Sequence, residues 1–99
     1  MAAILDVLDA AADEAREAAT WYAARNPVAA AAFELELSHA FTEIADGPNA
    51  WPVHVEGTRR FLLERFPYEV VYLVRNGRVL IVAIAHCRRR PGYWRERAG

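Results

Sequence analysis

Lysine is missing from this 99-residue chain, and cysteine occurs only once. The single Cys87 cannot form a disulfide within the chain and suits a reducing compartment. Long apolar runs are missing too, since the longest, residues 79–85, falls far short of the ~20 residues that a membrane-spanning helix needs. The first apolar stretch is interrupted by Asp6 and Asp9 and follows no basic leader, which is unlike a secretory signal. We therefore expect a soluble, cytoplasmic protein that does not span a membrane.

Basic residues are scarce in the first half of the chain, and acidic residues are scarce in the second half. Residues 1–50 hold nine acids and two arginines (2 − 9 = −7), whereas residues 51–99 hold ten arginines and four acids (10 − 4 = +6). Arginine keeps its charge when partly buried and presents a planar fork to phosphate or carboxylate. A GC-rich genome, which the twenty alanines also suggest, would explain the choice of arginine over lysine. It would not explain why the positive charge lies in one half.

The first half of the chain predicts two helices. Residues 4–8 are too few to classify by period and fit either an edge strand or the start of the first helix. A helix is predicted over Asp9–Arg25, with Asp9 able to cap it. The Asn26-Pro27 dipeptide ends that helix and begins a second one, as N-cap and first helical residue. The second helix should end at Gly47, which can adopt the left-handed C-terminal conformation.

Each predicted helix has one stripe of residues suited to a core. In the first helix the stripe consists of Ala11, Ala15, Ala18 and Tyr22, and in the second of Phe33, Leu37, Ala40, Phe41 and Ile44. Helices joined by so short a link form an antiparallel hairpin. Neither can bury its stripe fully against the other, so a sheet is required.

The second half of the chain supplies that sheet. Residues 60–66 are a strand candidate, and Pro67 marks the corner before the next strand. Two runs rich in β-branched and aromatic residues, Tyr68–Arg75 and Arg78–His86, are separated by Asn76-Gly77 alone. Asn-Gly in this place is the strongest short hairpin signal, because both turn positions need a positive φ. The two runs are nearly continuous in apolar residues, which predicts a central hairpin covered on both faces.

We therefore predict an α+β fold in one domain over residues 1–99. It consists of a possible N-terminal edge strand, a helical hairpin and a small antiparallel sheet of three further strands. Residues 88–99 are predicted to form a polar tail.

Several segments resemble toxins of the RelE/ParE superfamily, in the same order along the chain. The most specific are Arg65-Phe66-Pro67-Tyr68 and Ala85-His86-Cys87-Arg88-Arg89-Arg90-Pro91-Gly92-Tyr93-Trp94. The others are the helix junction 21–27, the helix 33–44, Trp51-Pro52, residues 58–63 and residues 70–72. The resemblance is closer to the ParE-like members. It implies a β-α-α-β-β-β fold in which residues 4–8 form a true first strand.

The resemblance also implies a function, that of the toxin in a type II toxin–antitoxin system. Such a toxin arrests growth, and systems of this kind serve in plasmid stabilization. A cognate antitoxin, here of the DNA-binding ParD-like kind, holds it inactive and alone connects it to operator DNA. ParE-like members poison DNA gyrase, which is the target we expect. The alternatives are a RelE-like endoribonuclease that cleaves mRNA on the ribosome, and a non-catalytic arginine-rich binding module or inactive toxin.

Metal-free RNA cleavage would need an acid, a base and cations to hold the developing phosphorane charge. His86, Tyr93 and Arg65 are the candidates, although His86 also fits a structural histidine hydrogen-bonded at a strand end. The resemblance places Glu69 and Cys87 where ribonuclease members usually carry basic residues. A carboxylate would repel phosphate and a thiol cannot hold it, so cleavage is disfavoured.

A gyrase-directed toxin needs a binding surface rather than a reactive cluster. The candidates for binding the target or the antitoxin are Arg59, Arg60, Arg65, His86, Arg88, Arg89, Arg90, Tyr93, Trp94 and Arg95. The tail that carries most of them also fits a solvated terminus, and Tyr93 and Trp94 also fit a role in packing the tail onto the sheet. Trp51-Pro52 fits a loop anchor at the helix–sheet junction. No cofactor is expected, and no metal site, because His39, His54 and His86 are isolated in the sequence.

Overall fold

The computed structural model of the chain describes residues 2–98 and contains a mixed four-stranded sheet with two long helices. The strands are β1 (Ile4–Val7), β2 (Arg59–Leu62), β3 (Tyr68–Arg75) and β4 (Arg78–His86), in the spatial order β1-β4-β3-β2. The helices are α1 (Asp9–Arg25), α2 (Pro27–Asp46), the short 3-10 turn η1 (Val55–Gly57) and α3 (Arg95–Ala98). The α+β fold class is thereby confirmed. Across residues 2–98, no helix has the length and apolar character needed to cross a membrane.

The N-terminal segment, which the residues alone left undecided, is an edge strand. β1 pairs with β4 from Ile4 opposite Arg78 to Val7 opposite Ile81, and it runs parallel to β4. The other pairings, β2 with β3 and β3 with β4, are antiparallel. The parallel strand is possible because the helical hairpin provides a long crossover between β1 and the rest of the sheet.

The helical hairpin turns at Asn26, as predicted. Its side-chain oxygen accepts a hydrogen bond from the amide of Val28 at 3.0 Å, and Pro27 opens α2. Two details of the prediction were wrong. Leu8, not Asp9, occupies the N-cap of α1, so Asp9 contributes only its charge to the first turn. Gly47 ends α2 with φ −149° and ψ 67°, which lies outside the left-handed region.

The β3–β4 hairpin has the predicted boundaries. Asn76 and Gly77 adopt φ values of 52° and 74°, so both turn residues lie in the left-handed region. The preceding strand is shorter than predicted, since β2 ends at Leu62 rather than at residue 66. Beyond it, a carboxylate oxygen of Glu36 on α2 accepts hydrogen bonds from the amides of Glu64 and Arg65, the latter at 3.2 Å. These bonds hold the chain in a turn instead of a strand.

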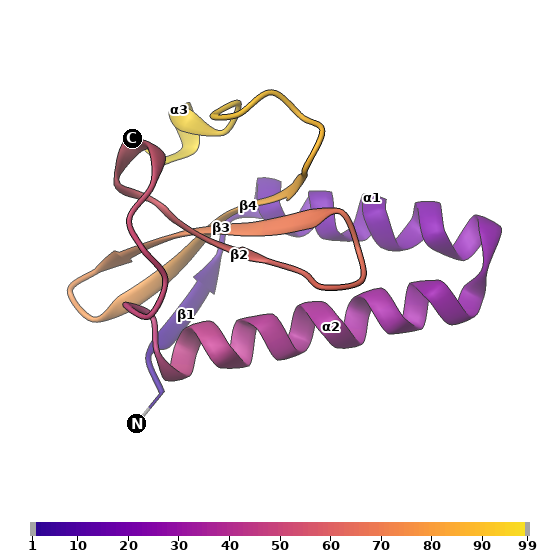
Figure 1. Ribbon diagram of the computed structural model, residues 1–99, viewed down its shortest axis with the longest axis horizontal. Helices are drawn as coiled ribbons and strands as arrows, with labels where there is room; N and C mark the ends of the chain where they lie inside the picture. Colours follow the sequence, from indigo (N-terminus) through magenta and orange to yellow (C-terminus); the bar gives the residue numbers. More distant parts are fainter. Residues whose placement is uncertain (1, 99) are drawn as a thin grey trace.

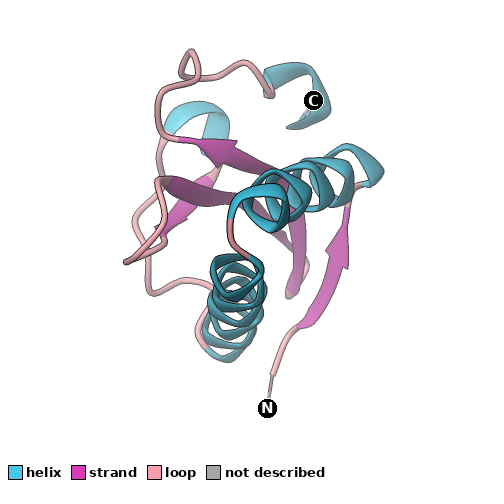
Figure 2. Cartoon of the chain, turned by 90° about the vertical axis from the view of Figure 1, so that its right-hand side faces the viewer, coloured by secondary structure: helices cyan, strands magenta, loops and turns pink. Residues whose placement is uncertain are grey.

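The sheet is covered on both faces, as the apolar runs predicted (Figures 1 and 2). We call the side under α1 and α2 the helix face and the opposite side, under the C-terminal segment, the tail face. The buried residues of the helix face are Ala11, Ala18, Phe33, Leu37, Ala40, Ile44, Leu63, Val70, Tyr72, Val79, Ile81 and Ile84. Those of the tail face are Val71, Leu73, Val82, Ala83, Ala85, Trp94 and Ala98. The segment predicted as a polar tail, 88–99, therefore contributes two core residues, which corrects that prediction.

Candidate functional site

Three consecutive arginines, Arg88 to Arg90, leave the sheet at the end of β4 and are exposed. The chain turns sharply here, because the Arg88 amide donates to Nδ1 of His86 and the Arg89 amide donates to the His86 carbonyl, each at 3.0 Å. Together with His86 and the ring of Tyr93 these arginines form what we call the arginine surface. Within residues 2–98 neither Arg88 nor Arg90 forms an ion pair, so both charges face solvent unpaired.

A buried carboxylate on α1, that of Glu14, lies behind the arginine surface. Its Oε2 accepts a hydrogen bond from the Tyr93 hydroxyl at 2.6 Å, and its Oε1 accepts one from Nη1 of Arg97 at 2.9 Å. The same Oε1 accepts from the backbone amide of Ile84 in β4 at 3.1 Å. Arg89 completes the cluster, with Nη1 3.7 Å from Oε2. Only 12% of the Glu14 side chain is exposed, so the carboxylate is nearly enclosed by its donors.

Tyr93 is fixed by contacts on its hydroxyl and on its ring. Cζ of Arg89 lies 3.7 Å from the centroid of the ring, and Cζ of Arg97 lies 5.3 Å from it. Burial, and then the hydrogen bond to Glu14, raise the pKa of the Tyr93 phenol well above its ordinary value. The bond to Glu14 also raises the pKa of Arg97. A phenol with its proton committed to a carboxylate is a poor general acid or base near neutral pH.

His86, the candidate acid or base, is held as a structural histidine would be. Its Nδ1 accepts the Arg88 amide, and its ring meets Tyr68 edge to face with centroids 5.0 Å apart. It lines a cleft of about 170 Å³ between the tail face and the tail, which Tyr93 and Cys87 also line. Across the described residues, 2–98, no group of three or more His, Cys, Asp or Glu side chains is placed to hold a metal ion.

The two residues that interrupt the ribonuclease pattern line this same cleft. Glu69 forms an ion pair with Arg60 at 3.4 Å, so the two opposite charges largely offset each other. Cys87 is exposed as a residue, but partial desolvation of its thiol, and then the nearby Glu69, raise the pKa of Cys87. Positions 69 and 87 therefore offer a phosphate neither an activated thiolate nor a cation, although Arg90 also borders the cleft.

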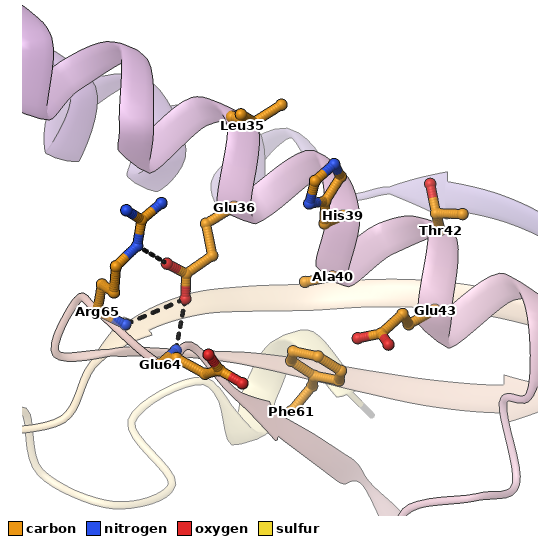
Figure 3. A pocket seen from close by; sticks show the side chains of 9 residues that line it. All are labelled: Leu35, Glu36, His39, Ala40, Thr42, Glu43, Phe61, Glu64 and Arg65. Carbon is orange, nitrogen blue, oxygen red and sulfur yellow. Dashed lines mark hydrogen bonds and ion pairs between the residues drawn. The ribbon is translucent and has the colours of Figure 1, made fainter.

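Arg65, the third catalytic candidate, belongs to another part of the molecule. It borders a groove of about 510 Å³ between α2 and the end of β2, where its Nε lies 3.4 Å from Oε1 of Glu36 (Figure 3). The groove around it is rimmed by the further carboxylates Glu43 and Glu64. The structure brings His86 and Tyr93 to one cleft but leaves Arg65 outside it.

The remaining candidates have structural partners. Arg59 donates from Nη1 to the carbonyl of Trp51, whose ring packs on Phe61 with centroids 4.8 Å apart, as expected of a loop anchor. Arg95 lies 3.7 Å from a carboxylate oxygen of Glu56, and both side chains are exposed. Trp94 is only 4% exposed in the tail-face core, so a partner cannot reach it in this conformation.

Gly92 sets the direction of the tail between the arginines and Trp94. It adopts φ +79°, and a Cβ added to it would lie 2.7 Å from Nε of Arg95. A side chain at this position would therefore strain the backbone and displace the Arg95 guanidinium. The turn directs Tyr93 and Trp94 back toward the sheet, whereas Arg88 and Arg90 are exposed.

Sequence reasoning did not single out Glu14, although a signal for it was present. The helical stripe of Ala11, Ala15 and Ala18 passes over position 14, because residues three and four apart lie on one helix face. A carboxylate on a stripe that must be buried requires partners. Those partners come from β4 and from the tail, which the sequence alone could not place beside α1.

The fold has a counterpart among solved structures. A chain described as the chromosomal ParDE TA system from P. aeruginosa is similar over 85% of this chain and 95% of its own, with a TM-score of 0.75 and 20% sequence identity. At that identity the likeness concerns the fold, a small α+β protein. No curated protein sequence matches the chain.

The family follows from the sequence match. Residues 5–91 match the model of the family described as ParE toxin of type II toxin-antitoxin system, parDE. The match begins within β1 and spans both long helices and the strands β2, β3 and β4. The chain belongs to the ParE toxin family of type II toxin–antitoxin systems, and the resemblance in the sequence is confirmed.

Proposed function

We propose that the chain is a single-domain, cytoplasmic toxin that arrests growth by binding DNA gyrase through its arginine surface. One observation carries the proposal. Tyr93 and His86, which could do acid–base chemistry, are engaged within the fold by Glu14 and by the Arg88 amide. Arg88 and Arg90, by contrast, are exposed and form no ion pair with any of the described residues 2–98. Such an arrangement suits binding rather than the cleavage of RNA.

The proposed inhibitor of the toxin is a cognate ParD-like antitoxin with an acidic segment. Residues 51–99 carry a net charge of +6, and an acidic partner would be steered toward that half and would pair with the free arginines. Operator DNA would then be bound by the antitoxin alone. The antitoxin and the gyrase would compete for overlapping parts of the arginine surface, which accounts for neutralisation without any further device.

The target is tested with purified toxin released from its antitoxin. We expect the wild-type protein to stop gyrase from supercoiling DNA and to leave mRNA on translating ribosomes intact. Growth arrest with unimpaired supercoiling and site-specific mRNA cuts would replace the proposal with the endoribonuclease. Harmless expression would support an inactive toxin or a binding module instead.

The surface is tested by reversing its two free charges together, Arg88→Glu with Arg90→Glu. We expect the affinity for the antitoxin and the inhibition of gyrase each to fall at least about tenfold, which corresponds to about 1.4 kcal/mol. Arg16→Glu with Arg25→Glu is the matched control, because it makes the same change of charge at two exposed arginines of α1. Equal affinities for the double variant and the control would place the binding surface elsewhere.

A further inference from the structure

The position of Glu14 is unusual because it lies where the sheet lacks a strand. β1 ends at Val7, and the last backbone bond from that side joins the amide of Leu8 to the carbonyl of Ile81 at 3.0 Å. β4 continues for five more residues beyond Ile81. On this open edge the Ile84 amide donates to Glu14, and the Val82 carbonyl accepts from Arg97 at 3.3 Å. A carboxylate from α1 and a guanidinium from the tail thus substitute for the missing strand.

The same two side chains connect the strand edge to the tail. Glu14 binds Tyr93 and Arg97 directly and Arg89 at longer range, so one carboxylate contacts residues on both sides of Gly92. Arg89 in turn stacks on the Tyr93 ring. The side chains of Arg89, Tyr93 and Arg97 therefore share a single acceptor on α1.

Packing alone does not require a carboxylate at this position. Its neighbours along the helix, Ala11, Ala15 and Ala18, are small and apolar, and an apolar side chain would continue their stripe. Burying a charge is costly unless every partner is in place, so a buried ionic cluster is by itself weak evidence for net stability. What Glu14 defines is the orientation of Arg89 and Tyr93, two members of the arginine surface.

We propose that Glu14 is the positioning residue of the toxin: by binding Tyr93, Arg89 and Arg97 it holds the arginine surface in the conformation that meets the target. The inference rests on the proposed function, since it assumes that the arginine surface binds a target. Glu14 itself lies behind this surface and need not touch the partner.

The test compares Glu14→Gln with Glu34→Gln. Glu34 is exposed on α2 and borders no residue of the tail, so its replacement makes the same change of charge away from the arginine surface. In protein labelled with fluorotryptophan, we expect the fluorine resonance of Trp94 to move in Glu14→Gln only. The resonance of Trp51, which packs on Phe61, should stay in place in both variants and reports an intact fold. At equal concentrations of folded protein, growth arrest and target inhibition by Glu14→Gln should fall about tenfold, as for a lost hydrogen bond to a charged group.

A second variant keeps the inference testable if Glu14→Gln folds poorly. Tyr93→Phe retains the ring beneath Arg89 and removes only the 2.6 Å bond to Glu14. It should give a smaller loss of potency in the same direction, with the Trp94 resonance moved and that of Trp51 unmoved.

Two results would overturn the inference. One is a Trp94 resonance unchanged in both Glu14→Gln and Tyr93→Phe, and the other is a displaced tail with wild-type potency. A toxic wild type that leaves gyrase untouched would remove only the proposed target, because growth arrest still compares the variants. Harmless expression of the wild type would overturn the proposed function and this inference with it, whereas equal toxicity of wild type and Glu14→Gln overturns the inference alone.

Discussion

Beneath the two long helices, Phe33, Ile44 and Tyr72 lie in a continuous apolar layer, whereas the opposite face of the sheet is covered by one four-residue helix and the ring of Trp94. The helix face needs little help from polar groups, because it buries apolar surface over nearly the full length of α2. The tail face is narrower and depends on the cluster around Glu14 for its attachment. One sheet thus has a face that stabilises the fold and a face that positions basic side chains.

The largest loss of stability is expected for a truncated side chain on the helix face. Phe33 is fully buried, and its ring meets those of Tyr22, Phe66 and Tyr68 with centroids 5.3 to 5.5 Å apart. Phe33→Ala should lower the free energy of unfolding by about 3–5 kcal/mol, because the cavity cannot close beneath two helices. Urea denaturation measures this change in the free energy of unfolding. Leu35→Ala, at an exposed position of α2, should change stability by about 0.5 kcal/mol or less.

A smaller and more local effect is expected on the tail face. Trp94→Ala removes a side chain of similar burial, yet we expect a loss of only about 2 kcal/mol, below the usual range for a buried aromatic. The tail can leave its face without unfolding the helices, which limits the cost to that of detaching it. Trypsin should cut at Arg95 and Arg97 much faster than in the wild type.

The exposed Trp21 provides the control, since Trp21→Ala should alter neither stability nor cleavage. If Trp94→Ala proves as costly as Phe33→Ala, with no selective cleavage of the tail, then the two faces unfold together and the contrast between them is wrong.

The smallest effect is on the pH dependence of stability. It distinguishes the attachment of the tail through Tyr93 and Glu14 from its attachment through the apolar Trp94. Folding raises the pKa of Tyr93, first by burial and then through Glu14. The unfolded chain loses this proton near pH ~10 while the folded protein keeps it. The contribution of the tyrosine is therefore complete below about pH 10 and decreases above it, by about 1.4 kcal/mol per pH unit.

Alkaline denaturation series on wild type and Tyr93→Phe measure this contribution. Both proteins should lose stability, because burial also raises the pKa of Tyr22, Tyr68 and Tyr72. The wild type should fall more steeply. Parallel curves would mean that the Tyr93 hydroxyl contributes nothing to the attachment of the tail.

Most of the fold could be predicted from local signals in the sequence. Asn26-Pro27 marked the turn between the helices, and Asn76-Gly77 fixed both strands of the central hairpin to the residue. These features depend on neighbouring residues alone, so an isolated sequence contains them. The end of β2 was missed, because the Glu36 carboxylate that turns the chain there comes from 28 residues earlier.

The candidate site was predictable in composition but not in arrangement. The sequence placed the arginines in the second half and identified His86, Tyr93 and Trp94 as neighbours of theirs. It could not tell that Trp94 is buried, that Arg60 is paired with Glu69, or that Arg65 faces α2. Each of these outcomes depends on a contact between separate elements.

The sequence by itself determined the two long helices, the central hairpin, the charge division between the halves and the membership of the ParE toxin family, because short-range propensities and motifs lie in consecutive residues. Tertiary structure alone decided which charged side chains are paired within the fold. Glu14 meets Tyr93 and Arg97 across 79 and 83 residues, and only the crossing of α1 over the open edge of β4 brings them together. Arg88 and Arg90 are left facing solvent for the same reason, since no acid of the first half reaches them within residues 2–98.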